Sequence, residues 1–356
     1  MDVVLFLLFI LGFLSAGRIF TRKIWNLNFS GPAETFVFSS ALGSVIASVM
    51  MTGLVFIGQV SSLTCWGVLA ILLFSGIGSL RDCRQWPERF MAGLASPVFF
   101  PLSPLKTAAQ TILGMLVLLA LSLALAPAFA TDALVYHLAV PKAFLQAGGL
   151  INLPNNIYSF FPQQIEMLYL LALALGSDSL AQLTGMGIVF LLLLALWQYY
   201  RQKGSAAYAW LVPLIFISTP TFFSVASSAY VDLQAAAYVF LAFYSWENGC
   251  TRKQAGWFFL MALFTGAAVA TKLTTVVILP LALLGLAVHG RSHKNTRQLV
   301  GQCLVLVLSS LMLLLPWLAR NYFFTGNPFA PFFMTFFGGE NGMNWDIERS
   351  QQQFQY

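Results

Sequence analysis

The stretch AAQTILGMLVLLALSLALAPAFA, residues 108–130, decides the fold class of this chain. It carries no charge and is long enough to cross the roughly 30 Å hydrocarbon core of a bilayer as a helix. Nine other apolar segments accompany it: residues 3–17, 36–58, 63–80, 179–199, 208–227, 233–246, 255–271, 273–288 and 299–318. A backbone in hydrocarbon must satisfy its own hydrogen bonds, so each segment is predicted to be helical. The sequence therefore predicts an all-α, polytopic membrane bundle of about ten transmembrane helices.

The composition of the whole chain agrees with this fold class. Of its 356 residues, 59% are hydrophobic and only 8% are charged, and the mean hydropathy is +0.79. A soluble globular domain usually carries roughly 25% charged residues. This excludes cytosolic enzymes, disordered scaffolds and nucleic-acid-binding proteins, and we expect no nucleic-acid partner. The four cysteines and three histidines are scattered, and they predict neither a disulfide framework nor a metal cluster built on imidazole.

The positions of the basic residues predict the orientation of the chain. If ten spans alternate and the N-terminus lies outside, fourteen of the eighteen Lys and Arg residues fall on the cytoplasmic side, as the positive-inside rule requires. The four that remain on the outer side are Lys142, Lys272, Arg320 and Arg349. We therefore interpret the net charge of +6 as a signature of topology rather than of affinity for phosphate polymers.

The long predicted outer loop, residues 131–178, has internal order. Residues 134–146 (LVYHLAVPKAFLQ) place their apolar side chains on one helical face, which predicts a helix lying in the membrane interface. The apolar run 163–176 carries Glu166 and is too short to span comfortably, so we expect a second interfacial or a re-entrant helix. The predicted divisions of the chain are an N-terminal membrane extension of three spans (1–107), a membrane core (108–337) and a polar outer tail (338–356).

Five charged residues at outer span ends or in the outer loop form the candidate site: Asp132, Asp232, Lys142, Lys272 and Arg320. Charged groups at membrane depth cost several kcal/mol unless they are paired or solvated, which favours a functional role. Structural roles stay open, because the aspartates could cap helices and the cations could anchor at the interface. In the functional interpretation, Asp132 is a carboxylate general base. Lys272 and Arg320 could then clamp a phosphate, and Lys142 could join them or bind anionic lipid.

Several motifs taken together resemble a known family. They are TDALVYHLAVPKAFLQAG (131–148), NNIYSFFPQQIEMLYLLALALG (155–176), SSAYVDL (227–233), GAAVATKLTTVVILP (266–280) and PWLARNYFFTGNPFAPFF (316–333). The region 108–337 that contains them resembles multi-spanning bacterial glycosyltransferases of the C-type superfamily, and is similar to protein mannosyltransferases and to the aminoarabinose transferase of lipid A. Such enzymes take a sugar from a polyprenyl phosphate or diphosphate donor on the outer side of the membrane.

The resemblance implies an inverting transfer. Asp132 would deprotonate the acceptor, Asp232 would be a second acidic catalytic residue, and the departing lipid phosphate would be held by two cations. The substrate-binding candidates are Lys272, Arg320, Lys142, Tyr136, His137 and Glu166. The implied partners are a polyprenyl-phosphate-linked sugar, a glycan, lipid or protein acceptor, and membrane lipids. The implied location is the inner (cytoplasmic) membrane with the active side facing the periplasm. No cofactor is specified, and assistance by a divalent metal stays open.

Two departures from the family pattern leave alternatives open. Ala133 follows Asp132 where the family often has an acidic doublet, and family members usually continue into further spans. A C-terminally truncated or inactive relative is therefore also compatible with the sequence. Other classes are a transporter or lipid flippase and a non-catalytic membrane assembly subunit. A transporter predicts charged residues at mid-membrane, which this sequence largely lacks away from the outer boundary.

Overall fold

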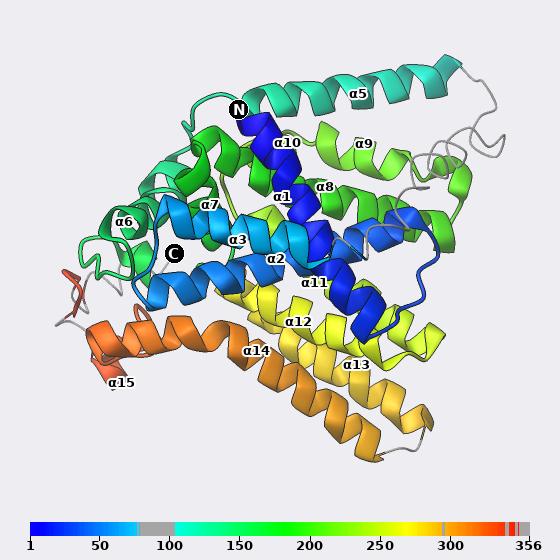
Figure 1. Ribbon diagram of the computed structural model, residues 1–356. Coiled ribbons are helices and arrows are strands. Elements are labelled where there is room, and N and C mark those ends of the chain that lie inside the picture. The colour runs from blue at the N-terminus through cyan, green and yellow to red at the C-terminus, as the bar shows by residue number, and fades with distance from the viewer. Residues whose placement is uncertain (77, 79–103, 294–295, 339–341, 346–347, 349–356) are drawn as a thin grey trace.

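The structure, a computed structural model, describes residues 1–76, 78, 104–293, 296–338, 342–345 and 348 (Figure 1). These residues form fourteen α-helices and no strand, which confirms the all-α prediction. The helices are α1 (Asp2–Arg18), α2 (Pro32–Phe56), α3 (Ser62–Ser75), α5 (Pro104–Ala124), α6 (Ala139–Ala147), α7 (Glu166–Leu175), α8 (Asp178–Lys203), α9 (Leu211–Ser218), α10 (Pro220–Ala226), α11 (Asp232–Arg252), α12 (Ala255–Thr271), α13 (Ile278–His293), α14 (Thr296–Thr325) and α15 (Met334–Phe337).

Six of the described helical segments are long and apolar enough to cross a membrane. They are Asp2–Ile24, Pro32–Phe56, Thr107–Ala124, Asp178–Lys203, Leu273–Gly290 and Thr296–Thr325. Such a set of helices supports a multi-pass membrane protein. The first of them is longer than the sequence suggested, because a π-helical extension, Ile19–Ile24, continues α1.

The other four predicted spans coincide with shorter, more polar or broken helices. Helices α3 and α12 have 14 and 17 residues, and α11 carries charged and polar residues in its last two turns. The predicted span 208–227 is divided into α9 and α10 at Thr219, which is extended with φ −75° and ψ 120°. Pro220 follows directly, and a proline disfavours helical geometry in the residue before it. A single unbroken helix over 208–227 is therefore not observed.

One large hydrophobic core joins the first three helices to the rest of the bundle. It includes Phe9 and Phe13 of α1, Phe38 of α2, Tyr169 of α7 and Trp257 of α12, all almost completely buried. Helix α1 packs against α2, α3 and α8, while α2 also packs against α7 and α8. Residues before and after position 107 thus belong to the same core.

Helix α7 lies inside this core rather than on the surface of the bundle. Eight of its ten residues are buried, including Glu166 at its first position. The helix packs against α2, α6 and α8. Because it is short and enclosed by longer helices, it reaches into the bundle from one end, as a re-entrant segment does. Helix α6, by contrast, buries Val140, Pro141 and Phe144 and leaves Lys142 exposed, as an amphipathic helix does.

The connections between helices gather at two ends of the bundle. At the end that holds α6, α7 and α15, on the left in Figure 1, distant segments are joined by hydrogen bonds. Val60 N donates to Gly148 O at 2.9 Å, and Ala128 N donates to Asp178 Oδ2 at 2.8 Å. The segment after α14 closes the same end, since Asn344 N donates to Pro154 O at 2.9 Å. We call this the α6 end.

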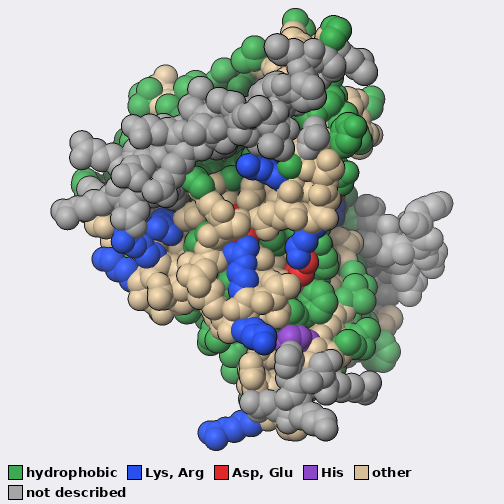
Figure 2. All heavy atoms as spheres, turned by 90° about the vertical axis from the view of Figure 1, so that its right-hand side faces the viewer, with side chains coloured by type: hydrophobic (Ala, Val, Ile, Leu, Met, Phe, Trp, Pro, Cys, Tyr) green, Lys and Arg blue, Asp and Glu red, His purple; other side chains and the backbone are tan. Residues whose placement is uncertain are grey.

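The opposite end carries much of the positive charge. Figure 2 looks onto it and shows Lys and Arg side chains spread over the surface with few acidic ones. An ion pair closes this end, in which Arg252 Nη2 donates to Oε1 of the fully buried Glu34 at 2.8 Å. The described basic side chains of its connecting segments that are at least partly exposed are Arg22, Lys23, Arg201, Lys203, Lys253 and Arg297. We call it the basic end; Arg81, Arg84, Arg89 and Lys294, which the sequence also assigned there, lie outside the described residues.

Candidate functional site

The α6 end contains all eight residues that the sequence singled out. Asp132 precedes a π-helical turn, Ala133–His137, and its side chain is exposed. The Tyr136 hydroxyl donates to Asp132 Oδ2 at 3.5 Å. Burial raises the pKa of the Tyr136 phenol, and the negative charges of Asp132, Glu166 and Asp232 raise it further. The phenol therefore stays protonated and remains a donor to Asp132, and all three carboxylates lie close enough to act on it.

His137, the residue after Tyr136 in this turn, forms a buried pair with Glu166, the first residue of α7. His137 Nδ1 lies 2.8 Å from Glu166 Oε1, and their side chains are only 1% and 4% exposed. Among the described residues, His137 Nε2 and Glu166 Oε2 have no hydrogen-bond partner. A buried polar atom without a partner is costly, so these two atoms are suited to bind a ligand.

Asp232 and Lys272 form a second, more open pair. Asp232 is the first residue of α11, and Lys272 lies directly after α12 in extended geometry. Lys272 Nζ bonds Asp232 Oδ1, and the two side chains are 38% and 45% exposed. The sequence predicted a turn at Lys272, and the structure places its ammonium beside the aspartate that begins the neighbouring helix.

Arg320 is buried near the end of α14. Its Nη2 donates to Phe161 O at 3.1 Å and to Asn321 Oδ1 at 2.8 Å. Its guanidinium carbon also lies 5.2 Å from the centre of the Trp317 ring. Arg320 thus fixes the backbone of the Phe161–Pro162 turn, and its joint action with Lys272 on a phosphate stays a prediction.

Two hollows adjoin the Asp232–Lys272 pair, and a third continues from the second of them. The first, which we call the aromatic cavity, has a volume of about 140 Å³. It is lined by Tyr136, His137, Tyr158, Phe161, Pro162, Glu166, Val231, Thr271, Lys272, Leu273, Thr274 and Phe332. The second, the Lys272 hollow, has a volume of about 550 Å³ and is lined by Asp232, Ala235, Ala236, Val239, Phe240, Phe243, Lys272, Thr274 and Thr275.

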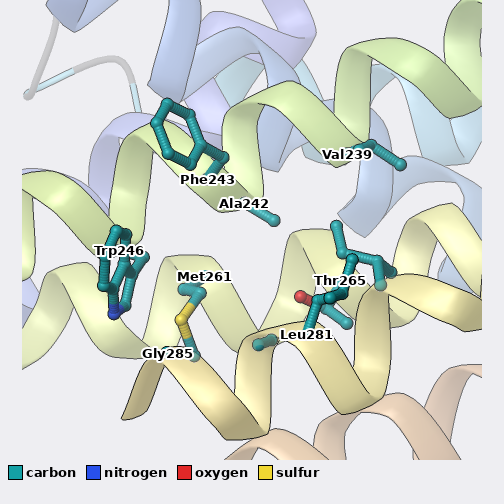
Figure 3. Close-up of a pocket in the computed structure, with 10 residues that line it drawn as sticks. Val239, Ala242, Phe243, Trp246, Met261, Thr265, Leu281 and Gly285 are labelled. Atoms are coloured by element: carbon teal, nitrogen blue, oxygen red, sulfur yellow. The ribbon is translucent and has the colours of Figure 1, made fainter. Parts of the chain in front are cut away.

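The third hollow, the α11 groove, is almost entirely apolar and measures about 290 Å³. Figure 3 shows Val239, Ala242, Phe243 and Trp246 of α11 across from Met261, Thr265, Leu281 and Gly285 of α12 and α13. The three hollows are neighbours, because Lys272 and Thr274 line the first two and Val239 and Phe243 line the last two. A ligand with a polar head and a long apolar part could therefore occupy all three.

The sequence identified the charged residues of this end but missed its aromatic walls. Phe332 and Tyr158 line the aromatic cavity, although neither stood out, because aromatic residues make up 15% of the chain. Lys142 is exposed on α6 and lines none of the three hollows. No group of three or more His, Cys, Asp or Glu side chains that could hold a metal ion occurs in the described part of the chain.

One family model matches nearly the whole chain. The chain is a member of the family described as a domain of unknown function (DUF8201), whose model matches residues 2–356. The match includes the first hundred residues together with those that carry the site, in agreement with their shared core. No curated protein and no solved structure matches the chain.

Proposed function

We propose that this protein is a membrane glycosyltransferase that moves a sugar from a polyprenyl-phosphate donor to an acceptor at the α6 end. The observation that carries the proposal is the row formed by the aromatic cavity, the Asp232–Lys272 pair and the α11 groove. A lipid-linked sugar has the same order of parts: a polar ring, a phosphate and a long hydrocarbon chain. The motifs that resemble C-type glycosyltransferases give independent support.

The proposed reaction is an inverting substitution. Asp132 removes the proton from the acceptor hydroxyl or amine, and the acceptor atom bonds to the anomeric carbon. The bond from that carbon to the phosphate oxygen breaks, and its electron pair leaves with the phosphate. Lys272, released in part from Asp232, stabilises the charge that develops there. Arg320 acts indirectly, because its bond to Phe161 O fixes the Phe161–Pro162 turn that lines the aromatic cavity.

The proposal includes a topology. We place the basic end in the cytoplasm and the α6 end at the outer face of the inner membrane, following the positive-inside rule. The chain then crosses ten times, with α9 and α10 together counted as one broken crossing and the N-terminus outside. Two hydrogen bonds support this alternation, because Ser177 donates to Asp2 at the α6 end while Gln198 donates to Ser30 at the basic end.

The test is transfer of a labelled sugar in membranes. Membranes containing the full chain are supplied with undecaprenyl phosphates that each carry one labelled hexose, pentose or amino sugar, and covalent products are separated from the donor. Asp132→Asn should lower the transfer rate by about 10²- to 10⁴-fold, the usual contribution of a positioned acid or base. Asp178→Asn is the matched control, since Asp178 also lies at the α6 end but accepts from the backbone N–H groups of Ala128 and Ser179. Asp132, by contrast, accepts from Tyr136, which lines the aromatic cavity.

A second pair of variants tests the phosphate-binding role. Lys272→Gln should lower transfer strongly, whereas Lys142→Gln, which changes an exposed lysine outside the three hollows, should leave it close to the parent rate. Parent-level transfer by Asp132→Asn would contradict the assignment of the base. Movement of the labelled lipid between leaflets without any covalent product would contradict transfer itself and favour a flippase.

A further inference from the structure

The aromatic cavity is bounded by two stacked pairs of rings. The Tyr136 and Tyr158 rings stack with centroids 4.7 Å apart and an interplanar angle of 22°. The Phe161 and Phe332 rings stack at 5.8 Å and 14°. Ring faces are apolar and carry partial negative charge, so they favour contact with the C–H groups of a flat ligand. The four rings come from different segments of the chain, so the tertiary fold, and not a single helix, brings them together.

The polar part of the lining consists of the buried His137–Glu166 pair. In the neutral form of the imidazole, Nδ1 carries the proton and donates to the carboxylate oxygen Oε1. Nε2 then carries a lone pair, and Glu166 Oε2 is also an acceptor. Neither atom has a partner among the described residues. The pair thus presents two hydrogen-bond acceptors, and the ligand that satisfies both must bring two donors.

The dimensions of the cavity narrow the choice of ligand. Pockets for drug-sized ligands usually measure about 300–1,000 Å³, whereas this cavity measures about 140 Å³. It therefore has room for a single small ring. A neutral ring with apolar faces and two neighbouring hydroxyls satisfies all of these conditions.

We infer that the aromatic cavity binds the sugar ring of the lipid-linked donor, with one hydroxyl donating to His137 Nε2 and another to Glu166 Oε2. This assignment rests on the proposed function and identifies the part of the donor that the cavity selects. The pair is a specificity determinant, because a sugar that lacks either hydroxyl leaves a buried acceptor without a partner. The phosphate then lies at Lys272, which lines both this cavity and the neighbouring hollow.

The experiment measures binding rather than turnover. The full chain is purified in mild detergent, and its melting temperature is followed with undecaprenyl phosphate alone and with undecaprenyl phosphate bearing glucose, mannose, galactose, N-acetylglucosamine or arabinose. We expect at least one sugar to stabilise the protein beyond the sugar-free lipid. Glu166→Gln and His137→Phe should weaken this sugar-dependent binding by about 10- to 100-fold, as expected for a hydrogen bond to a charged or buried group. Stabilisation by the sugar-free lipid should persist in both.

Two further variants keep the test decisive. Lys142→Gln, outside the cavity, should retain the full sugar-dependent increment. Phe332→Leu removes one ring of a stacked pair and leaves both acceptors in place, so it should lower the increment even if the buried-pair variants do not fold. The inference is overturned if no sugar in the panel adds to the stabilisation by undecaprenyl phosphate, or if the increment is the same in Glu166→Gln, His137→Phe and Phe332→Leu as in the parent.

The outcomes separate this inference from the proposed function. One outcome is that the protein binds the sugar in a way that requires Glu166 but forms no covalent product with any acceptor. This result would support the ring site and contradict the transferase. Efficient transfer by Glu166→Gln and His137→Phe with unchanged donor preference would support the transferase and contradict the ring site.

Discussion

Helices α1 and α2 cross so closely that their backbones are in contact at Gly43, and adding one methyl group there should push the helices apart. A Cβ built at Gly43 of α2 would lie 1.8 Å from the carbonyl oxygen of Phe13 in α1, whereas real Cβ contacts essentially never fall below 3.0 Å. Gly43→Ala therefore forces the two helices apart by about 1.2 Å, the difference between these distances. Overpacking of a core costs about 1–3 kcal/mol. The upper value applies here because the added methyl group would meet the Phe13 backbone, which cannot move aside as a flexible side chain can.

Part of this cost is offset by helix propensity. Alanine is favoured over glycine in a helix interior by about 1 kcal/mol, so Gly43→Ala should lose a net of about 2 kcal/mol. Gly53 lies on the same helix, and a Cβ there meets nothing within 4 Å. Gly53→Ala should therefore be neutral or stabilising by up to about 1 kcal/mol, which gives a difference of about 2–3 kcal/mol between the two variants, and about 3 kcal/mol when the full helix-propensity gain is realised.

The assay is thermal unfolding of the two purified variants side by side in the same detergent, followed by tryptophan fluorescence. A difference of about 3 kcal/mol corresponds to a gap in melting temperature of roughly 5 °C or more for a chain of this size. Gly43→Ala should be the less stable of the two. Equal melting temperatures for Gly43→Ala and Gly53→Ala would refute the close α1–α2 crossing, and with it the inclusion of the first helix in the common core.

Three further predictions concern the two ends of the bundle. At the basic end, Arg252→Met leaves the fully buried Glu34 without its guanidinium partner, so stability measured by thermal unfolding should fall by about 3–5 kcal/mol; an unchanged melting temperature would argue against the pair. At the α6 end, the raised pKa keeps the Tyr136 phenol protonated as a donor to Asp132. Tyr136→Phe should therefore slow sugar transfer without moving the alkaline limb of its pH profile, and a shifted limb would contradict this. Asn321→Ala removes bonds to two backbone carbonyls at 2.9 Å; it should lower stability by about 2 kcal/mol, and a variant that melts with the parent would show that water replaces the amide.

The predicted spans were most accurate where a long apolar run has polar ends. The predicted range 36–58 became α2, and 179–199 became α8, each within a few residues. Prediction was poorer for residues 208–227, because an apolar run does not reveal that Thr219 adopts an extended conformation before Pro220. The apolar run 163–176 was recognised as too short to span, but its burial depends on packing against α2, which is distant in sequence, and against α8.

The candidate site shows a similar division. Asp132, Asp232 and Lys272 stood out in the sequence because charge is rare in this chain and each follows or precedes an apolar run. Their partners could not be predicted, since the ion pair of Lys272 with Asp232 joins residues 40 positions apart in the chain. His137 and Glu166 were candidates individually, and only the packing of α7 against the turn that follows Asp132 makes them a pair.

The sequence by itself determined that this protein is helical, that its apolar segments suit a membrane, and that most of its basic residues belong to one side of the bundle. Those properties follow from local composition, because a bilayer selects segments by their own hydrophobicity and length. Only the tertiary structure decided which polar groups meet and where space remains beside them. The aromatic cavity, the Asp232–Lys272 pair and the α11 groove are each lined by helices or turns far apart in the chain. Such contacts depend on helix packing, which the hydrophobicity of a single segment does not encode.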